Sequence, residues 1–527
     1  MSKVKTYLGQ KGYTIIKDSI SPHEQQFIRD DLNVKPYVPK TSMVKPKPFP
    51  VYRESSKKLY VPRYYGIKMY GEPQENKLIG DATQQEKMDS SKQLTFKGNL
   101  RDYQVPIVNK YIDVAKNIGG GLIEVYCGGG KTCMALNIIS QLGKKTLIIV
   151  HKDFLLQQWV ERINEFLPDA RIGRIQGQIV DTDDKDIVIG MLQSLSMKSY
   201  EPSTFADFGL TVIDECHHIA AEVFSNALFQ IVTPYMLGLS ATMNRKDGLT
   251  RIFKMFIGEV AYKLTREDTD DVLVKAIEFK TKDEDFNNTE LNFRGQTHYS
   301  LMIKKICEFN PRTEFLLKVL TDTLADEKNK QIMILAHNKN LLTYLFKAIE
   351  HRNMATVGYY IGGMKQKDLK ESENKRVIVA TYAMAEEALD IKTLSTLIMA
   401  TPKTDVTQAV GRILRMKHEQ THVIDIVDVH DSFRNQFRER QVFYKKNGYK
   451  IIHTDSDSYE SNIANWRVLY DPSNQINKTN KTNKTNKTSK TGKQCKSNTL
   501  SQSVTDTNNI IDIDTSDGMP GKCLIEL

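Results

Sequence analysis

Two series of short apolar runs constrain the fold of this chain more than any other feature of its sequence. The first series comprises LIEVY (122–126), TLIIVH (146–151), DIVIGM (186–191), LTVIDE (210–215) and YMLGLS (235–240). The second comprises QIMILA (331–336), RVIVAT (376–381), LSTLIMAT (394–401) and THVIDIVD (421–428). Longer amphipathic segments separate the runs, which is typical of parallel strands covered by helices on both faces. The sequence therefore predicts an α/β fold with two consecutive parallel-sheet domains.

The segments outside these series differ in composition. A chain of 527 residues exceeds what one hydrophobic core normally organises, so several domains are expected. Residues 1–95 are dense in proline, lysine and tyrosine and predict a small accessory domain. The two α/β domains then span residues 96–265 and 311–455, and the acidic and polar residues 266–310 predict a linker with little core of its own. Residues 456–527 are expected to be largely disordered, because repeats of NKT cannot bury enough apolar surface to order themselves.

Charge and cysteine usage narrow the class of protein. The formal charge of +10 favours a polyanionic partner, although a basic protein can simply be a soluble one. The six cysteines include no CxxC pair, which argues against a disulfide framework and against a zinc site. The start MSKVKTYLGQ lacks the apolar core of a signal peptide, and no run approaches the roughly 20 apolar residues of a membrane span. We therefore expect a soluble intracellular protein with no membrane partner.

The stretch EVYCGGGKT (124–132) follows an expected strand and precedes a helical pattern. It ends like a phosphate-binding loop, but Val125 stands where the usual pattern GxxxxGK[ST] has its first glycine. A glycine loop between a strand and a helix turns backbone N–H groups toward phosphate oxygens, so the context favours a nucleotide site over a flexible turn. Lys131 is expected to reach the β and γ phosphates of ATP, and Thr132 to hold Mg²⁺. The loop residues expected to bind ATP with them are Cys127, Gly128, Gly129 and Gly130.

Two acids end the run LTVIDE. In a doubly wound sheet the carboxyl ends of the strands form the ligand-binding edge, which also presents the glycine loop. Asp214 can hold Mg²⁺ at that edge, and Glu215 can orient or deprotonate an attacking water. A surface turn that begins with two acids is the alternative, and the upstream loop argues against it.

Four motifs together resemble a known family. GGGKT (128–132), DECH (214–217), LGLSAT (237–242) and QAVGRILR (408–415) resemble motifs I, II, III and VI of the superfamily 2 helicases and translocases. These enzymes accept a non-glycine residue at the first loop position, so Val125 is compatible with the resemblance. The resemblance implies two tandem RecA-like domains, ATP and Mg²⁺ as cofactors, and hydrolysis coupled to movement on nucleic acid.

The same resemblance implies roles for single residues. In LRDYQ (100–104), which resembles the Q motif, Gln104 would read the adenine edge, while Phe96 and Tyr103 are either stacking or core residues. Asp390 of motif V would contact ATP, although Ala388 replaces the glycine common there. The implied nucleic-acid contacts are His151, Lys152, Gln193, Ser194 and Thr381. The residues implied to couple hydrolysis to movement are His217, Ser240 and Thr242.

Motif VI explains why two domains are needed. Gln408, Arg412 and Arg415 are its implied catalytic residues, and the spacing of the two arginines places them on one helical face. Guanidinium groups suit recognition of the γ-phosphate, and an arginine supplied across a cleft stabilises charge in the transition state. Two arginines on a solvated helix are the alternative.

Further segments resemble one branch of the superfamily. DECHH and NRKDG (244–248) resemble the XPB-like DNA translocases, although Lys246 replaces the glutamate of their Arg-Glu-Asp element. Residues 49–66 and 441–451 resemble the poxvirus-type helicase of large cytoplasmic DNA viruses, which acts in transcription and transcript release. The resemblance implies a DNA translocase, with RNA polymerase or transcription factors as possible partners and a place in the virion or host cytoplasm. The sequence gives no indication of the oligomeric state.

Three functions stay open at this point. They are a DNA helicase or translocase, an RNA-directed helicase, and a nucleic-acid-binding transcription scaffold without hydrolysis. DECHH in place of the DEAD tetrapeptide disfavours the second, and intact Lys131 and Glu215 argue against the third. The cations and aromatic residues of the N-terminal module suit single strands or a fork, and docking onto the first α/β domain is the competing role.

The C-terminal tail gives a first prediction. Seven lysines recur at every third position without an intervening acid: Lys478, Lys481, Lys484, Lys487, Lys490, Lys493 and Lys496. We hypothesise that they tether the protein to nucleic acid, a solvated tail without function being the alternative. Truncation after Ser473 is then expected to flatten the salt dependence of binding, since each neutralised phosphate adds about 0.7 to 0.9 to the slope. Superimposable plots of affinity against salt for the full-length and truncated proteins would contradict the hypothesis.

Overall fold

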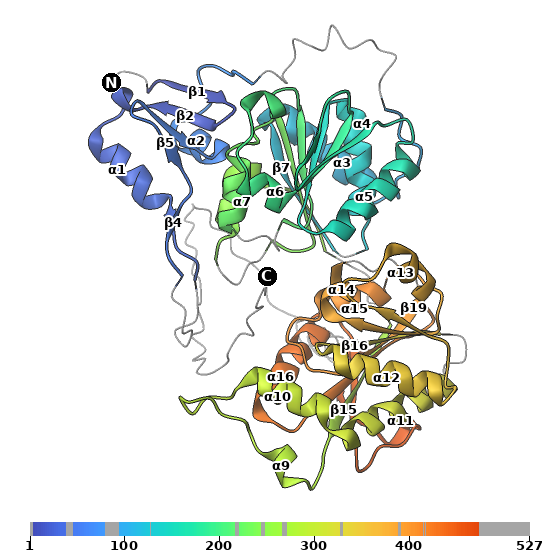
Figure 1. The fold of residues 1–527 in the computed structure, drawn as a ribbon. Helices are drawn as coiled ribbons and strands as arrows, with labels where there is room; N and C mark the ends of the chain where they lie inside the picture. Colours follow the sequence, from blue (N-terminus) through green and yellow to red (C-terminus); the bar gives the residue numbers. More distant parts are fainter. Residues whose placement is uncertain are drawn as a thin grey trace, which may run out of the picture. The chain divides into compact units, whose positions relative to one another are not determined.

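The computed structural model describes residues 4–37, 46–78, 94–126, 128–216, 221–243, 248–265, 271–326, 330–387, 391–414, 416 and 418–473. The chain forms two compact units, Met1–Glu267 and Asp268–Leu527. Each unit contains one eight-stranded sheet (Figure 1). The expected fold class, two tandem α/β domains with a small N-terminal accessory domain, is confirmed. The lysine-rich tail lies outside the described residues.

The sheet of the first unit has the strand order β10-β9-β11-β8-β12-β13-β7-β14. Its strands are β7 (Gly120–Val125), β8 (Thr146–Val150), β9 (Ile172–Gln176), β10 (Ile179–Asp181), β11 (Ile187–Met191), β12 (Leu210–Ile213), β13 (Tyr235–Ser240) and β14 (Val260–Leu264). Neighbouring strands are parallel except in the hairpin of β9 and β10. In β8, Leu147 and Ile149 pack on one face of the sheet while Ile148 and Val150 pack on the other. Burial on both faces is the reason that these strands read as continuous apolar runs.

Helices cover both faces of this sheet (Figure 1). One core contains residues of α3 (Gln104–Ile118), α4 (Lys131–Leu142) and α5 (Asp153–Phe166). The other contains residues of α6 (Leu192–Met197), η3 (Pro202–Phe205), α7 (Ala221–Leu228) and α8 (Thr250–Ile257). Gly119 and Gly143 adopt the left-handed conformation that ends α3 and α4, so each helix stops where the chain must turn back into a strand.

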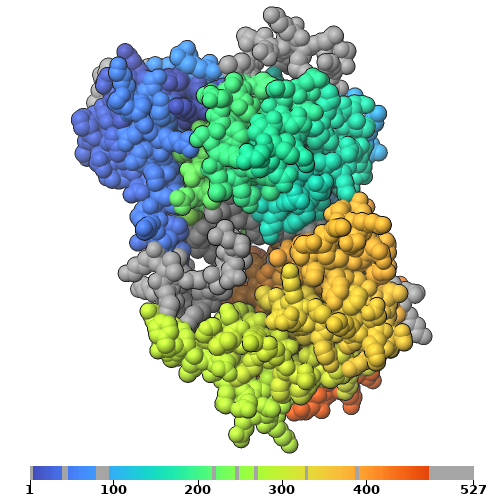
Figure 2. Space-filling model, viewed as in Figure 1, coloured from blue at the N-terminus to red at the C-terminus, as the bar shows by residue number. Residues whose placement is uncertain are grey.

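An N-terminal module docks on this domain. Its sheet has the order β1-β2-β6-β5, and its elements are β1 (Thr6–Gly9), β2 (Gly12–Ile16), η1 (Lys17–Ser19), α1 (Pro22–Asp31), β3 (Asn33–Val34), β4 (Phe49–Pro50), β5 (Arg53–Glu54), β6 (Lys58–Val61) and α2 (Arg63–Tyr70). Arg63 donates to the carbonyl of Pro234 at 2.7 Å, and Arg53 lies over the Phe229 ring at 5.2 Å. Figure 2 shows the module in blue against the green part of the same unit. Docking therefore accounts for part of its cationic and aromatic content.

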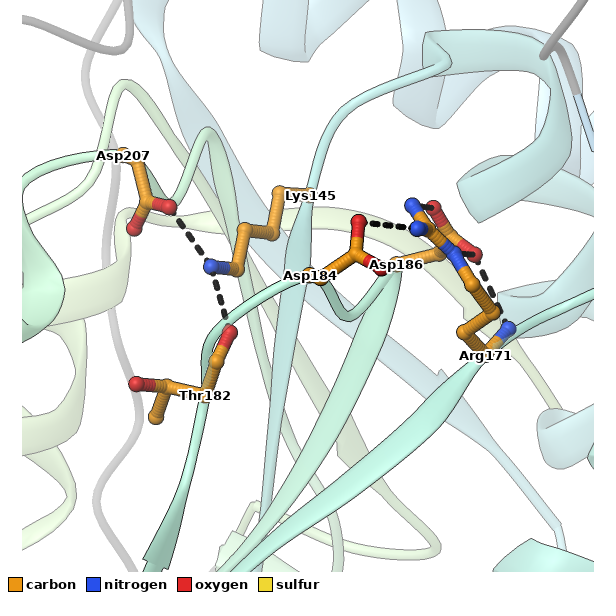
Figure 3. Close-up of polar contacts among 6 residues, drawn as sticks. All are labelled: Lys145, Arg171, Thr182, Asp184, Asp186 and Asp207. Atoms are coloured by element: carbon orange, nitrogen blue, oxygen red, sulfur yellow. Dashed lines mark hydrogen bonds and ion pairs between the residues drawn. The ribbon is translucent and has the colours of Figure 1, made fainter.

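A set of ion pairs and hydrogen bonds, here called the ionic staple, joins the segments that precede β8, β9 and β11 in the first unit (Figure 3). Arg171 precedes β9 and pairs with Asp186, which precedes β11, at 2.8 Å, and it also pairs with Asp184. Lys145 precedes β8 and contacts Asp207 at 2.6 Å and the carbonyl of Thr182 at 2.8 Å. Ligands of parallel sheets bind at the opposite edge, so we assign these contacts to strand alignment.

The sheet of the second unit has the order β17-β18-β16-β19-β20-β15-β21-β22 and is parallel except for β21 and β22. Its strands are β15 (Val272–Phe279), β16 (Gln331–Ala336), β17 (Val357–Tyr360), β18 (Val377–Thr381), β19 (Leu394–Met399), β20 (Thr421–Asp428), β21 (Lys450–Asp455) and β22 (Arg467–Tyr470). Its helices are α9 (Glu284–Asn287), α10 (Tyr299–Glu308), α11 (Asn310–Asp326), α12 (Lys339–His351), α13 (Gln366–Ser372), α14 (Tyr382–Glu387), α15 (Thr407–Ile413), α16 (Asp431–Lys446) and η5 (Ile463–Asn465).

Of the segment expected to be a linker, residues 266–310, the described part from residue 271 onward contributes to this unit. Strand β15 lies between β20 and β21, and Ile277, Phe279 and Met302 belong to the hydrophobic core. Acidic runs flank VLVKAIEF, the sequence of β15, so the composition of the whole segment did not predict this strand. At the other boundary the sheet continues past residue 455, since β22 pairs with β21 and Trp466 is buried.

No helix in the described part of the chain is long and apolar enough to cross a membrane.

Two buried arginine–aspartate pairs join helices of the second unit to β20, an interior strand of its sheet. Arg312 of α11 pairs with Asp428 at the end of β20, and neither side chain is exposed. Arg440 of α16 pairs with Asp425 of β20, again without exposure. Each guanidinium also donates to a backbone carbonyl, Arg312 to Ala400 at 2.9 Å and Arg440 to Lys403 at 2.7 Å. The pairs therefore hold residues 400–403, which lead from β19 toward α15.

Removing one partner of such a pair is expected to be costly. Asp428→Asn leaves the Arg312 guanidinium buried opposite a neutral amide, and breaking a buried pair costs about 3–5 kcal/mol. The matched control is Glu314→Gln, which removes an acid of α11 itself. Its pair with Arg352 is 44–47% exposed, and such pairs contribute about 0–1 kcal/mol. Urea denaturation gives both free energies of unfolding. Equal losses for the two variants would contradict the assignment of Arg312 and Asp428 to the core.

Candidate nucleotide site

Four adjacent strands bring the candidate residues of the first unit to one edge. The strands are β8, β12, β13 and β7, which lie side by side in this order and run parallel. Their carboxyl ends are followed by His151, Asp214, Ala241 and Tyr126 respectively. Segments that are far apart in the sequence are therefore neighbours at the edge where such sheets bind ligands.

The glycine loop has the geometry of an anion cradle. Gly128 and Gly130 have positive φ angles of 83° and 80°, and α4 begins directly after Gly130. A Cβ atom on Gly129 would lie 2.4 Å from the Val125 side chain, so larger residues are excluded there. The N–H groups at the start of α4 have no partners within the helix and favour negative charge. Val125 is the last, fully buried residue of β7, which explains why a strand residue replaces the first glycine. Cys127 lies outside the described residues.

Gln104 is hydrogen-bonded to the backbone of this loop. Its side chain is 2% exposed, and its Nε2 atom donates to the carbonyl of Gly129 at 2.9 Å. Its Oε1 atom accepts from the backbone N–H of Arg101 at 2.9 Å. The Tyr103 hydroxyl donates to the same Gly129 carbonyl at 3.2 Å, whereas Phe96 stacks on Phe166. These bonds use one of the two N–H groups and one of the two oxygen lone pairs of the Gln104 amide.

Lys131 and Glu215 form an ion pair within the site. The Nζ atom of Lys131 lies 3.3 Å from Oε1 of Glu215, and the side chains are only 10% and 20% exposed. Glu215 has a φ angle of 47°, a left-handed conformation that is unfavourable for a residue with a Cβ atom. The lysine of the loop and the second acid of DECH, 84 positions later in the sequence, are thus in contact.

Asp214 is a buried acid that accepts two hydrogen bonds. Trp159 of α5 donates its Nε1–H to Oδ2 at 2.9 Å, and the backbone N–H of Glu215 donates to Oδ1 at 3.0 Å. Burial and the neighbouring Glu215 raise the pKa of Asp214 from 3.8 to about 6, against the opposing effect of these donors and of Lys131. Sequence reasoning missed Trp159. Its place in the apolar pattern of an amphipathic helix predicts a core residue and does not indicate a hydrogen bond to Asp214.

The donors present fit a hard cation bound together with a nucleotide. Asp214 supplies a carboxylate and Thr132 a hydroxyl, at the edge where the loop begins α4. Among the described residues no group of three or more His, Cys, Asp or Glu is placed to hold a metal ion. Mg²⁺ needs no such group, because one or two protein oxygens together with phosphates and water complete its octahedron.

The remaining candidates of the first unit lie along the same edge. The Ser240 hydroxyl donates to the carbonyl of Thr242 at 2.6 Å and accepts from its N–H at 3.1 Å, forming a closed turn after β13. Gln193 donates to the carbonyl of His151 at 2.9 Å, so the segments after β11 and β8 are joined. The Ser194 hydroxyl accepts from Gly177 at 2.9 Å. Lys152 is the N-cap of α5, and His217 lies outside the described residues.

The described candidate residues of the second unit lie on helix α15 and at the junction of β18 with α14. Gln408 and Arg412 are on α15, and α14 starts directly after Thr381, the last residue of β18. The loop before α15 is held by the Arg440 contact with Lys403, and Tyr382 donates to the carbonyl of Thr401 at 2.6 Å. Asp390 and Arg415 lie outside the described residues.

Comparisons with known proteins match both units. Residues 97–245 match the family model described as "Type III restriction enzyme, res subunit", and residues 313–417 match "Helicase conserved C-terminal domain". The protein named "Putative ATP-dependent RNA helicase L396", from Acanthamoeba polyphaga mimivirus, is 33% identical over 465 residues, covering 85% of this chain and 87% of its own. "Putative ATP-dependent RNA helicase QP509L" of African swine fever virus (isolate Pig/Kenya/KEN-50/1950) is 25% identical, covering 71% and 78%. "DNA 3'-5' translocase XPB2" of Sulfurisphaera tokodaii is 28% identical, covering 54% and 60%.

The buried charge of Asp214 predicts a conflict between stability and activity. Since its folded pKa of about 6 lies above 3.8, the folded protein binds this proton more tightly than the unfolded chain. The carboxylate therefore destabilises the fold above about pH 6, and the penalty disappears as the pH falls toward 4. Asp214→Asn keeps an acceptor for Trp159 and is expected to raise the free energy of unfolding by about 2–3 kcal/mol near pH 7, while abolishing ATP hydrolysis. A gain of equal size near pH 4 would contradict this cause.

The ion pair predicts different effects for its two members. Lys131→Ala is expected to abolish ATP binding and turnover, because the phosphates lose their counter-charge. If Glu215 acts as the base, Glu215→Gln is expected to retain nucleotide binding while hydrolysis stalls, because the amide keeps the shape of the site but cannot accept a proton. Nucleotide affinity and single-turnover hydrolysis measured separately distinguish the two roles. Loss of affinity in Glu215→Gln as complete as in Lys131→Ala would show that the roles are assigned wrongly.

Proposed function

This chain belongs to the superfamily 2 helicases and hydrolyses ATP, and from that premise we propose that it uses hydrolysis to move along DNA. The observation that supports the proposal most is the meeting of three separate segments at one sheet edge. The glycine loop starts α4, Lys131 contacts Glu215 at 3.3 Å, and Asp214 is held beside them by Trp159. Such an edge can bind phosphates, a hard cation and a water molecule together.

We propose that nucleotide binding rearranges the ion pair. Phosphate oxygens would compete with Glu215 for the Lys131 ammonium, because both are anionic and the loop amides already favour a phosphate. Glu215, released from its cation, can then accept a proton from water. Bound Mg²⁺ would supply positive charge next to Asp214 and so lower its pKa, which burial and the neighbouring Glu215 raise.

Gln408, Arg412 and Arg415 are proposed to act on the same nucleotide from the second unit. An arginine that contacts the γ-phosphate mainly in the transition state lowers the barrier without tightening substrate binding. Opening and closing of the two units around ATP would then move one relative to the other along the nucleic acid. The proposed contacts with the nucleic acid are His151, Lys152, Gln193, Ser194 and Thr381.

DNA is the proposed track, and RNA is the second candidate. A relative matching over 54% of the chain is named a DNA 3'-5' translocase, and DECHH resembles that branch. Two viral relatives are named ATP-dependent RNA helicases, and this observation keeps RNA as the alternative. Contacts with a phosphate backbone carry little base information, so weak sequence specificity is expected on either track.

A role in viral transcription is a narrower proposal. It is supported by the viral source of two relatives and by the resemblance of residues 49–66 and 441–451 to the transcript-release helicase. RNA polymerase or transcription factors would then be partners, in the virion or the host cytoplasm.

One assay tests the track. ATP turnover is measured without nucleic acid and with single-stranded DNA, duplex DNA and RNA of matched sequence, using Lys131→Ala to subtract contaminating hydrolysis. Stimulation by DNA well above that by RNA is expected. The reverse order would replace the proposal by the RNA-directed function, and equal basal turnover under every condition would exclude both.

A second assay tests the proposed arginine. Arg415→Ala is expected to reduce single-turnover hydrolysis on the order of a thousandfold with little change in ATP affinity. The matched control is Arg438→Ala, which removes an exposed arginine of α16 in the same unit. Hydrolysis by Arg415→Ala at the rate of the control would place Arg415 outside the active site.

A further inference from the structure

The four-stranded sheet of the N-terminal module has two unlike faces. One face is apolar and packs against α1 and α2, with Tyr13, Ile15, Leu59 and Val61 all fully buried in that core. Side chains alternate between faces along a strand, so the residues between these four belong to the opposite face. That face carries Tyr7 from β1, Thr14 from β2, and Lys58 and Tyr60 from β6.

The aromatic residues of the second face form a row across the sheet. Tyr7 pairs with Thr14, and Thr14 pairs with Tyr60, so the two tyrosines lie on either side of Thr14. Adjacent strands are about 4.8 Å apart, which places the two tyrosines about 10 Å from each other. Thr14 is only 1% exposed, whereas both tyrosines are partly exposed. The row continues to Arg53, the register partner of Tyr60, which reaches the carbonyl of Asn226 in the α/β domain at 3.2 Å.

Lysine ammonium groups lie close to these rings. The ammonium of Lys58 is 5.3 Å from the centroid of Tyr7, and that of Lys77 is 4.6 Å from the same centroid. The ammonium of Lys11 is 5.5 Å from the centroid of Tyr60. Lys58 also donates to the Tyr7 hydroxyl at 3.0 Å. The face thus combines aromatic surfaces with three cations.

Several acids of the module are engaged elsewhere. Glu54 pairs with Lys17 and Arg29, Asp31 pairs with Arg251 of the α/β domain, and Glu24 caps α1. Of the three lysines, Lys77 pairs with Glu75, and both side chains are exposed. A polyanion bound at this face can replace Glu75, because exposed ion pairs are weak. Docking uses Arg53, at one end of the row, and Arg63 of α2, while Tyr7, Thr14 and Tyr60 form the rest of the row.

We propose that this face, Tyr7, Lys11, Lys58, Tyr60 and Lys77, binds single-stranded DNA, with the lysines on phosphates and the tyrosines stacked on unpaired bases. The inference rests on the proposed function, which supplies the DNA. Cationic grooves with aromatic side chains are the general solution for unpaired strands, because every base offers a ring for stacking. Duplex DNA keeps its bases stacked internally, so it would gain only the phosphate contacts.

The test uses the full-length protein and labelled oligonucleotides without nucleotide. Fluorescence anisotropy measures affinity for single-stranded and duplex DNA of one sequence over a range of salt concentrations. Tyr60→Ala is expected to weaken single-strand binding about 5- to 100-fold, with a smaller effect on duplex, and Tyr60→Phe is expected to bind like wild type. Lys11→Ala and Lys58→Ala are each expected to lower the salt slope by about 0.7.

Matched controls come from the same module. Lys68→Ala removes an exposed lysine of α2, and Tyr37→Ala removes a tyrosine that is 66% exposed. Both are expected to bind like wild type, and thermal melting verifies that every variant is folded. The inference is overturned if Tyr60→Ala binds as tightly as the controls, or if it loses single-strand and duplex affinity equally.

The same preparations separate this inference from the proposed function. ATP turnover of the wild-type protein is measured on the same oligonucleotides. Absence of stimulation by any nucleic acid would defeat the proposed function. Stimulation of the wild type together with unchanged binding by Tyr60→Ala would defeat the inference alone.

Discussion

Parallel backbone pairing of β8, β12, β13 and β7 is the constraint on which the candidate site depends. Because these strands run in one direction, their carboxyl ends meet at one edge, and each is followed by a candidate segment. The hydrophobic cores on the two sheet faces hold the register, since a slip of one residue would exchange the residues of both cores. The ionic staple of Arg171, Asp186 and Lys145 fastens the opposite edge (Figure 3). The contacts that align the strands therefore lie at their amino-terminal ends, and the candidate site lies at their carboxyl ends.

The site stores unfavourable features that a nucleotide can relieve. Asp214 is a buried carboxylate with a raised pKa, Glu215 has a left-handed backbone, and Lys131 is paired with Glu215. A buried charge and a left-handed backbone each cost stability. Phosphates bound at this edge would compensate for such costs, which would couple local stability to nucleotide binding. Deviations from ideal local structure of this kind are common where chemistry occurs.

Buried charge has a different use in the second unit. Arg312 with Asp428 and Arg440 with Asp425 each form two hydrogen bonds between guanidinium and carboxylate. Each arginine keeps one further bond for a carbonyl of residues 400–403. A loop fixed in this way delivers α15 in one orientation, which matters for Gln408 and Arg412 if they act on a nucleotide. Hydrophobic residues of similar size could fill the same volume, but they could not hold those carbonyls.

The sequence by itself determined the two parallel sheets, the glycine loop and the acids after β12, because doubly buried strands and phosphate loops leave local patterns in the chain. It did not reveal β15, since one strand between acidic runs has no pattern that separates it from a linker. Nor did it reveal the bond from Trp159 to Asp214 or the support of Gly129 by Gln104, which join residues 55 and 25 positions apart. The sequence likewise did not distinguish which cations and aromatic residues of the N-terminal module serve docking and which are available to bind nucleic acid. Only the tertiary structure separated them, because register and docking, which depend on contacts between distant segments, decide which face each side chain occupies.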